Sequence, residues 1–154
     1  MTRPSAGDPA PSFEMTADDG SIVSSETLAG SRYVLYFYPK DDTPGCTVQA
    51  CGLRDSWSPV AETGVQVFGI SPDGVKKHVK FREKYALPYR LLADDGHQVA
   101  EAFGVWVEKK FAGRTYFGNE RTTFIVGADG RVEHVLPQVK PDAHAEQLLE
   151  ALAA

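Results

Sequence analysis

The stretch that decides the fold is YVLYFYPKDDTPGCTVQAC, from Tyr33 to Cys51. Its first residues, 33–38, are apolar, aromatic or β-branched, a composition typical of a buried strand. Pro39 ends this run because proline has no backbone N–H to donate to a neighbouring strand. Residues 46–58 contain no proline and are predicted to form a helix. The stretch therefore predicts a strand, a loop and a helix in succession.

Cys46 lies in the first turn of this predicted helix, for which Thr43 or Gly45 serves as the N-cap. At that position free backbone N–H groups and the positive end of the helix dipole favour a negative charge. The ionised sulfur is the nucleophilic form of cysteine. We therefore predict a reactive thiolate at Cys46.

The second of the two cysteines, Cys51, follows five residues after Cys46. On an ideal α-helix this offset separates the Cα atoms by roughly 8 to 9 Å, from the standard rise and radius. A disulfide requires Cα atoms no more than about 7 Å apart. The two sulfurs can therefore bond only after the first turn or two unwinds, and Gly52 weakens the helix by roughly 1 kcal/mol relative to alanine. We predict a switch, in which one thiol reacts in the folded helix and the other traps its product.

Length and composition predict a single domain over residues 1–154, since 42% of the side chains are hydrophobic and need no metal or disulfide to form a core. The net charge of −5 argues against nucleic acid as a partner. The first thirteen residues lack the apolar core of a secretory signal. No apolar run approaches the roughly 20 residues of a membrane span. Together with a cysteine pair of the catalytic or redox-sensing kind, these features predict a cytoplasmic protein with no membrane partner.

The rest of the chain alternates short apolar runs with helical patterns. We expect strands at 13–16, 21–24, 33–38, 65–70, 90–93, 122–126 and 131–135, and helices at 46–58, 72–85, 97–103 and 141–153. Turn signals at Asp19-Gly20 and Asp129-Gly130 join two of the strand pairs into hairpins, the first of which opens the domain. This alternation predicts an α/β fold with a mixed sheet.

The pattern Pro39-x-x-x-Thr43-x-x-Cys46 resembles the active-site signature of the peroxiredoxins, and the position of Cys51 resembles their Q-type subfamily, also called bacterioferritin comigratory protein. Later blocks resemble that subfamily in order and spacing: Gly104-Val105-Trp106, Glu108-Lys109-Lys110, Tyr116-Phe117-Gly118 and Glu120-Arg121-Thr122-Thr123-Phe124. The similarity covers nearly the whole chain. Val107 and Gly127 depart from the subfamily's usual Gly and Asp, away from the proposed chemistry.

This resemblance implies a thioredoxin-like mixed sheet flanked by helices, with an N-terminal β-hairpin. It also implies an antioxidant enzyme, a thiol-dependent peroxidase for hydrogen peroxide and alkyl hydroperoxides that uses no cofactor and no metal. Cys46 would attack the peroxide and become a sulfenic acid, and Cys51 would resolve it as an intramolecular disulfide. Thioredoxin or a similar dithiol would then reduce the disulfide, and the chain would be a monomer.

The resemblance assigns a role to three further residues. Arg121 would favour the thiolate and bind a peroxide oxygen through its planar fork of donors. Thr43 would hydrogen-bond the sulfur or the peroxide, and Pro39 would shield the sulfur from water. The backbone N–H of Cys46 would add one more donor.

Two other classes of function compete with this interpretation. A general thiol-disulfide oxidoreductase uses a Cys-x-x-Cys pair, and here the second cysteine stands two positions farther along. A redox-responsive binding module would use the Cys46–Cys51 bond to remodel a surface for a partner. The four histidines are dispersed and do not pair with the cysteines at the spacing of a zinc site, and the sequence lacks a glycine-rich phosphate loop. Consumption of peroxide separates the enzyme from the module.

Overall fold

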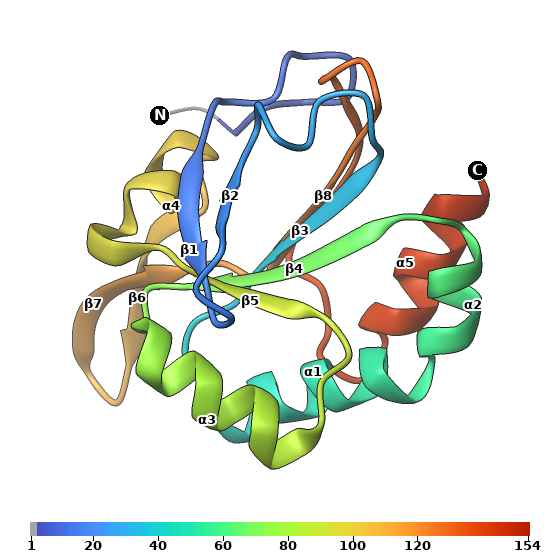
Figure 1. The fold of residues 1–154 in the computed structure, drawn as a ribbon. Coiled ribbons are helices and arrows are strands. Elements are labelled where there is room, and N and C mark those ends of the chain that lie inside the picture. Colours follow the sequence, from blue (N-terminus) through green and yellow to red (C-terminus); the bar gives the residue numbers. More distant parts are fainter. Residues whose placement is uncertain (1–2) are drawn as a thin grey trace.

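The structure, a computed structural model, describes residues 3–154, and its main feature is a seven-stranded mixed sheet (Figure 1). The order in the sheet is β2-β1-β5-β4-β3-β8-β9. The strands are β1 (Glu14–Ala17), β2 (Ile22–Ser24), β3 (Tyr33–Phe37), β4 (Gln66–Ser71), β5 (Arg90–Ala93), β8 (Thr122–Val126) and β9 (Val132–Leu136). β3, β4 and β5 run parallel, whereas β1 and β8 join them antiparallel. The expected mixed sheet and N-terminal hairpin are confirmed.

Helices cover both faces of the sheet. They are α1 (Pro44–Asp55), α2 (Trp57–Glu62), α3 (Val75–Tyr85), the short η1 (Asp95–His97), α4 (Gln98–Ala102) and α5 (His144–Ala153). α1, α2, α3 and α5 share one apolar cluster with Val34 and Tyr36, while α4 shares the other with Leu35 and Phe37. Because successive residues of a strand point to opposite faces, β3 supplies both clusters and lies at the centre of the core. None of the helices in the described residues is long and apolar enough to cross a membrane.

The parallel register brings the loops after β3 and β4 to one edge of the sheet. Tyr33 of β3 lies beside Gln66 of β4, and Phe37 beside Ile70. The carboxyl ends of parallel strands face the same way, and in open α/β sheets this edge is where ligand sites form. The loop that leads into Cys46 begins at this edge.

The cysteine helix is shorter at its C-terminal end than predicted. α1 ends at Asp55, and Ser56 (φ −104°, ψ 21°) separates it from α2. A continuous helix over 46–58 was therefore a wrong prediction. Proline in a helix interior clashes with the carbonyl four residues earlier, which for Pro59 is that of Asp55. The chain starts a new helix at Trp57, which places Pro59 in its first turn.

The start of α3 was also misplaced. The prediction began this helix at Pro72 with Ser71 as its cap, but β4 continues through Ser71 and α3 begins at Val75. Ser71 Oγ donates to Asp73 Oδ2 over 2.7 Å and accepts from the Asp73 N–H over 3.2 Å. These two bonds close a turn between strand and helix, so Asp73 stays outside the helix.

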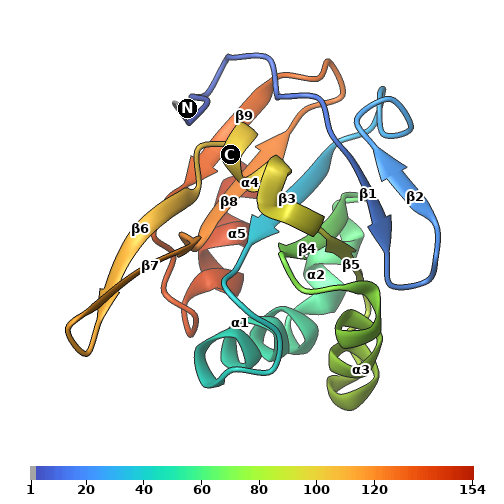
Figure 2. The ribbon, with the colours of Figure 1, turned by 90° about the vertical axis from the view of Figure 1, so that its left-hand side faces the viewer.

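A second, two-stranded sheet was not predicted as an element. β6 (Trp106–Phe111) and β7 (Arg114–Asn119) form a hairpin that projects from the body of the molecule (Figure 2). Its turn consists of Ala112 (φ 51°) and Gly113 (φ 78°). Two successive positive φ angles are the mark of a type I′ turn, which asparagine or aspartate followed by glycine usually signals. Because alanine stands at the first position of this turn, the sequence lacks the usual turn signal there.

Alanine substitutions of Gly69 and Gly52 should change the free energy of unfolding in opposite directions, the first through packing and the second through helix propensity. A Cβ on Gly69 would lie 2.9 Å from Leu91 Cδ2 and Tyr36 Cζ, and the Tyr36 hydroxyl is fixed 2.8 Å from that of Tyr89. Gly69→Ala should therefore lower the free energy of unfolding by about 1–3 kcal/mol. A Cβ on Gly52 in α1 would meet no atom within 4 Å, so Gly52→Ala should raise it by about 0.5–1 kcal/mol. Urea unfolding measures both changes, and equal effects of the two substitutions would contradict this packing.

Candidate active site at the start of helix α1

Both cysteines are free thiols within the continuous helix α1. Cys46 is the third residue of the helix and only 2% exposed, while Cys51 is half-buried. The helix keeps their Cα atoms roughly 8 to 9 Å apart, from ideal geometry. Both thiols are thus unbonded while the helix between them is intact, as the helical spacing predicts.

Thr43 occupies the N-cap position of α1, but its hydroxyl does not cap the helix. Its backbone is extended (φ −98°, ψ 155°), and Pro44 fills the first helical position. The Thr43 hydroxyl donates to the carbonyl oxygen of Lys40 over 2.9 Å. The oxygen of Thr43 can still accept a hydrogen bond. Gly45, the alternative cap in the sequence analysis, lies inside the helix.

Arg121 immediately precedes β8 and reaches the first turn of α1. Its Nη1 donates to Oε1 of Gln49 over 2.8 Å. A Cβ on Gly45 would lie only 2.7 Å from Arg121 Nη2, so the guanidinium lies directly against the backbone of the residue before Cys46. The structure therefore places Arg121 against the turn that carries Cys46, and glycine at position 45 permits the approach.

Pro39 is half-buried at the end of β3, where the loop toward Thr43 begins. The carbonyl oxygen of the preceding residue, Tyr38, accepts a hydrogen bond from Asn119 Nδ2 over 3.1 Å. This bond ties the end of β7 to the residue before Pro39. The prediction placed Pro39 beside the sulfur, and its place in the loop leading to α1 is compatible with that role.

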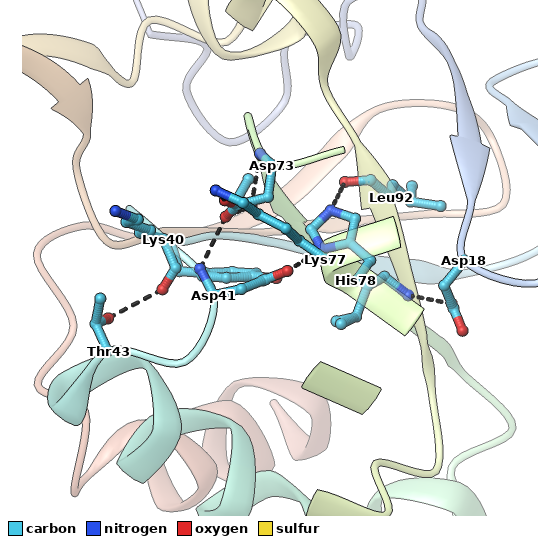
Figure 3. A network of polar contacts seen from close by, with 11 residues as sticks. Asp18, Lys40, Asp41, Thr43, Asp73, Lys77, His78 and Leu92 are labelled. Carbon is cyan, nitrogen blue, oxygen red and sulfur yellow. Dashed lines mark hydrogen bonds and ion pairs between the residues drawn. The ribbon is translucent and has the colours of Figure 1, made fainter. Parts of the chain in front are cut away.

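A buried polar network holds the loop between Pro39 and α1 (Figure 3). Asp41 accepts a hydrogen bond from the Tyr38 hydroxyl, and its Oδ2 lies 2.6 Å from Nδ1 of His78 in α3. The Asp41 N–H donates to Asp73 Oδ2 over 2.8 Å. Nε2 of His78 lies 2.9 Å from the carbonyl oxygen of Leu92, which can only accept, so this nitrogen carries a proton. Burial and the neighbouring Asp41 raise the pKa of Tyr38 well above its ordinary value, which keeps the phenol a donor.

The second buried network lies behind Arg121, and no pattern in the sequence predicted it. Gln49 Nε2 lies 3.1 Å from Nδ1 of His144, and His144 Nε2 lies 2.7 Å from Oγ1 of Thr123. All three side chains are at most 1% exposed. Burial and, to a smaller extent, the positive charge of Arg121 lower the pKa of His144 to about 4. The imidazole is therefore neutral at physiological pH.

Lys109 on β6 is a further charged group near the site that the prediction did not include. Burial and the charge of Arg121 lower the pKa of its ammonium, while Cys46 acts in the opposite direction. Lys109 thus lies near enough to interact with both residues. The signal in the sequence is the block Glu108-Lys109-Lys110, whose resemblance to the subfamily implies no role for Lys109.

His144 should make stability depend on pH. Because the folded protein resists protonation until about pH 4, whereas the unfolded chain protonates near 6.5, stability falls as the pH drops through this interval. Between pH 7 and pH 5 this histidine should remove about 2 kcal/mol from the free energy of unfolding. The His144→Asn variant has no titrating group at this position. Its free energy of unfolding, measured with urea, should therefore fall by about 2 kcal/mol less than that of the wild type between pH 7 and pH 5. The same pH dependence in both proteins would contradict the assignment.

Comparison with known proteins identifies the family. The AhpC/TSA family model matches residues 6–135. Peroxiredoxin Bcp of Escherichia coli (strain K12) is 48% identical over 147 residues, covering 96% of this chain and 94% of the relative. A mutant of PrxQ from Xylella fastidiosa has a similar structure, with a TM-score of 0.91, 28% identity and coverage of 99% of this chain and 98% of that chain.

A structure of the Xanthomonas campestris bacterioferritin comigratory protein, from work on its alkyl peroxide reduction activity, superimposes with a TM-score of 0.85. It is 32% identical and covers 92% of this chain and 90% of that chain. These likenesses extend over the thioredoxin-like sheet and its helices. The chain therefore belongs to the AhpC/TSA family, as a peroxiredoxin of the Q type.

Proposed function

We propose that this peroxiredoxin reduces hydrogen peroxide and alkyl hydroperoxides with Cys46 as the attacking thiolate. The observation that carries the proposal is a free, buried cysteine in the first turn of α1 with the Arg121 guanidinium packed against the adjacent Gly45. A cation and helical N–H groups beside a sulfur favour its ionised form. The alkyl peroxide reduction of the Xanthomonas campestris relative supports the wider substrate class.

In the first step the Cys46 thiolate attacks the terminal oxygen of the peroxide and the O–O bond breaks. The sulfur becomes a sulfenic acid, and the other oxygen leaves as hydroxide or alkoxide and takes a proton from water. Arg121 would stabilise the charge that develops on the departing oxygen. Thr43 would accept a hydrogen bond from the peroxide, because its hydroxyl proton is already donated to the backbone carbonyl oxygen of Lys40. Pro39 would keep water from the sulfur.

In the second step the Cys51 sulfur attacks the Cys46 sulfur, and the sulfenic hydroxyl leaves as water. The new disulfide requires α1 to unwind, because five helical residues hold the two Cα atoms too far apart. Thioredoxin or a similar dithiol would reduce this bond by exchange. We further propose that residues 1–154 act as one domain and as a monomer in the cytoplasm, where such dithiols are kept reduced.

Two cysteine variants test the assigned roles. Cys46→Ser should abolish consumption of hydrogen peroxide and of an alkyl hydroperoxide. Cys51→Ser should react once and then accumulate sulfenic or sulfinic acid, because the resolving thiol is missing. Dithiol-dependent turnover and the mass of each product measure both outcomes. If Cys46→Ser consumed peroxide as fast as the wild type, the redox-responsive binding module would be the better account.

Gly52→Ala tests whether unwinding of α1 limits disulfide formation. A helix stabilised by up to about 1 kcal/mol should slow the step from sulfenic acid to disulfide by as much as about fivefold. The preceding reaction with peroxide, measured in the same stopped-flow experiment, serves as the internal control and should keep its rate. A normal resolution rate in a more stable protein would show that α1 does not need to unwind at this residue.

A further inference from the structure

Arg121 is the end of a hydrogen-bonded chain that crosses the interior of the protein. The chain runs from Arg121 through Gln49 of α1 and His144 of α5 to Thr123 of β8. Its three contacts measure 2.8, 3.1 and 2.7 Å. The reaction proposed above uses none of the three residues behind Arg121. Three elements that are distant in sequence therefore meet behind one guanidinium.

The donors and acceptors of this chain can be assigned in one direction only. Arginine has donors and no acceptor, so Arg121 must face the oxygen of the Gln49 amide. The Gln49 amide nitrogen then points to Nδ1 of His144, which must accept. A neutral imidazole that accepts at Nδ1 carries its proton on Nε2 and donates it to Thr123 Oγ1. The observed orientation of the Gln49 amide and the Nε2–H tautomer of His144 thus require each other.

We propose that His144 is a positioning residue for peroxide reduction: its neutral Nε2–H tautomer fixes the Gln49 amide, which in turn holds Arg121 against the first turn of α1. This inference rests on the role of Arg121 in the proposed function. Without an acceptor at the Nδ1 position the buried Gln49 nitrogen would have no partner. A proton on Nδ1 would instead favour the amide turned over, which would place its NH₂ group against the donors of Arg121.

The groups around His144 keep its imidazole in this state. The Tyr36 ring lies edge-on with its centre 5.4 Å from that of the imidazole, and Thr123 and Gln49 occupy the two nitrogens. Behind Gln49 stands the Arg121 guanidinium, whose charge opposes an imidazolium. A protonated His144 would donate from Nδ1, and the Gln49 amide would have to turn over in response.

Two amide substitutions of His144 form a matched pair. The side-chain oxygen of Asn falls near the position of Nδ1 and can accept from Gln49, whereas the longer Gln places its polar atoms near Nε2. His144→Asn should therefore keep the second-order rate constant for hydrogen peroxide within about threefold of the wild type. His144→Gln should lower it by about tenfold or more, because the Gln49 amide loses the acceptor that fixes it and so holds Arg121 less firmly. Equal rates for the two folded variants would overturn the proposal.

Arg121→Met separates this inference from the function on which it rests. If Arg121→Met reacts like the wild type, the proposed role of Arg121 fails. If Arg121→Met is slow while His144→Gln is as fast as the wild type, only the inference fails. In the Arg121→Met background His144→Gln should have no further effect, since it acts through the guanidinium. A full additional loss there would indicate a general structural role and overturn the proposal.

Thr123→Val keeps the proposal testable if His144→Gln does not fold. This substitution preserves the shape of the side chain and removes the acceptor for Nε2–H, so the imidazole can shift its proton to Nδ1. The rate constant for hydrogen peroxide should fall by about threefold or more in the wild-type background. It should not fall further in the Arg121→Met background. An unchanged rate constant in folded Thr123→Val would overturn the proposal.

Discussion

The helix between Cys46 and Cys51 imposes two opposite requirements on the protein. As long as α1 is intact, its first turn holds Cys46 next to Gly45, against which Arg121 packs, but keeps Cys51 out of reach. When α1 unwinds, the thiols can meet, but the surroundings of Cys46 are lost. Gln49 lies between the two cysteines and bonds to Arg121, so the contacts that build the site also resist its opening. The stability of one short helix therefore governs both proposed steps.

The N-terminal end of α1 is held more firmly by its surroundings than the C-terminal end. On its N-terminal side the loop is fixed by the buried Asp41, which binds His78 and Tyr38, and by the bond from its N–H to Asp73. On the C-terminal side the helix contains Gly52, which has free space around it, and ends at a break before α2. Local opening draws on the least stable parts of a fold. Unwinding should thus spread from the C-terminal part of α1 while the loop before Cys46 keeps its place.

The sequence could predict whatever depends on neighbouring residues. The run from Tyr33 to Cys51 contains the strand, the loop and the start of the cysteine helix within nineteen positions, and all three form as expected. The hairpin of β6 and β7 was missed because Ala112 replaces the residue that usually signals its turn. The partnership of Gln49 with His144 spans 95 positions, and no local pattern can indicate it. Long-range packing alone gives these two residues a place at the site.

The groups behind Arg121, the Gln49 amide and the His144 imidazole, are neutral, and this has an electrostatic consequence. A carboxylate at position 49 would also hold the guanidinium, but it would cancel part of the positive charge that a thiolate and a departing oxygen require. The Gln49 amide and the His144 imidazole fix the direction of Arg121 without adding a charge of their own. A neutral amide also costs less to bury than a carboxylate. The chain through His144 thus orients the cation and leaves its field available to the sulfur.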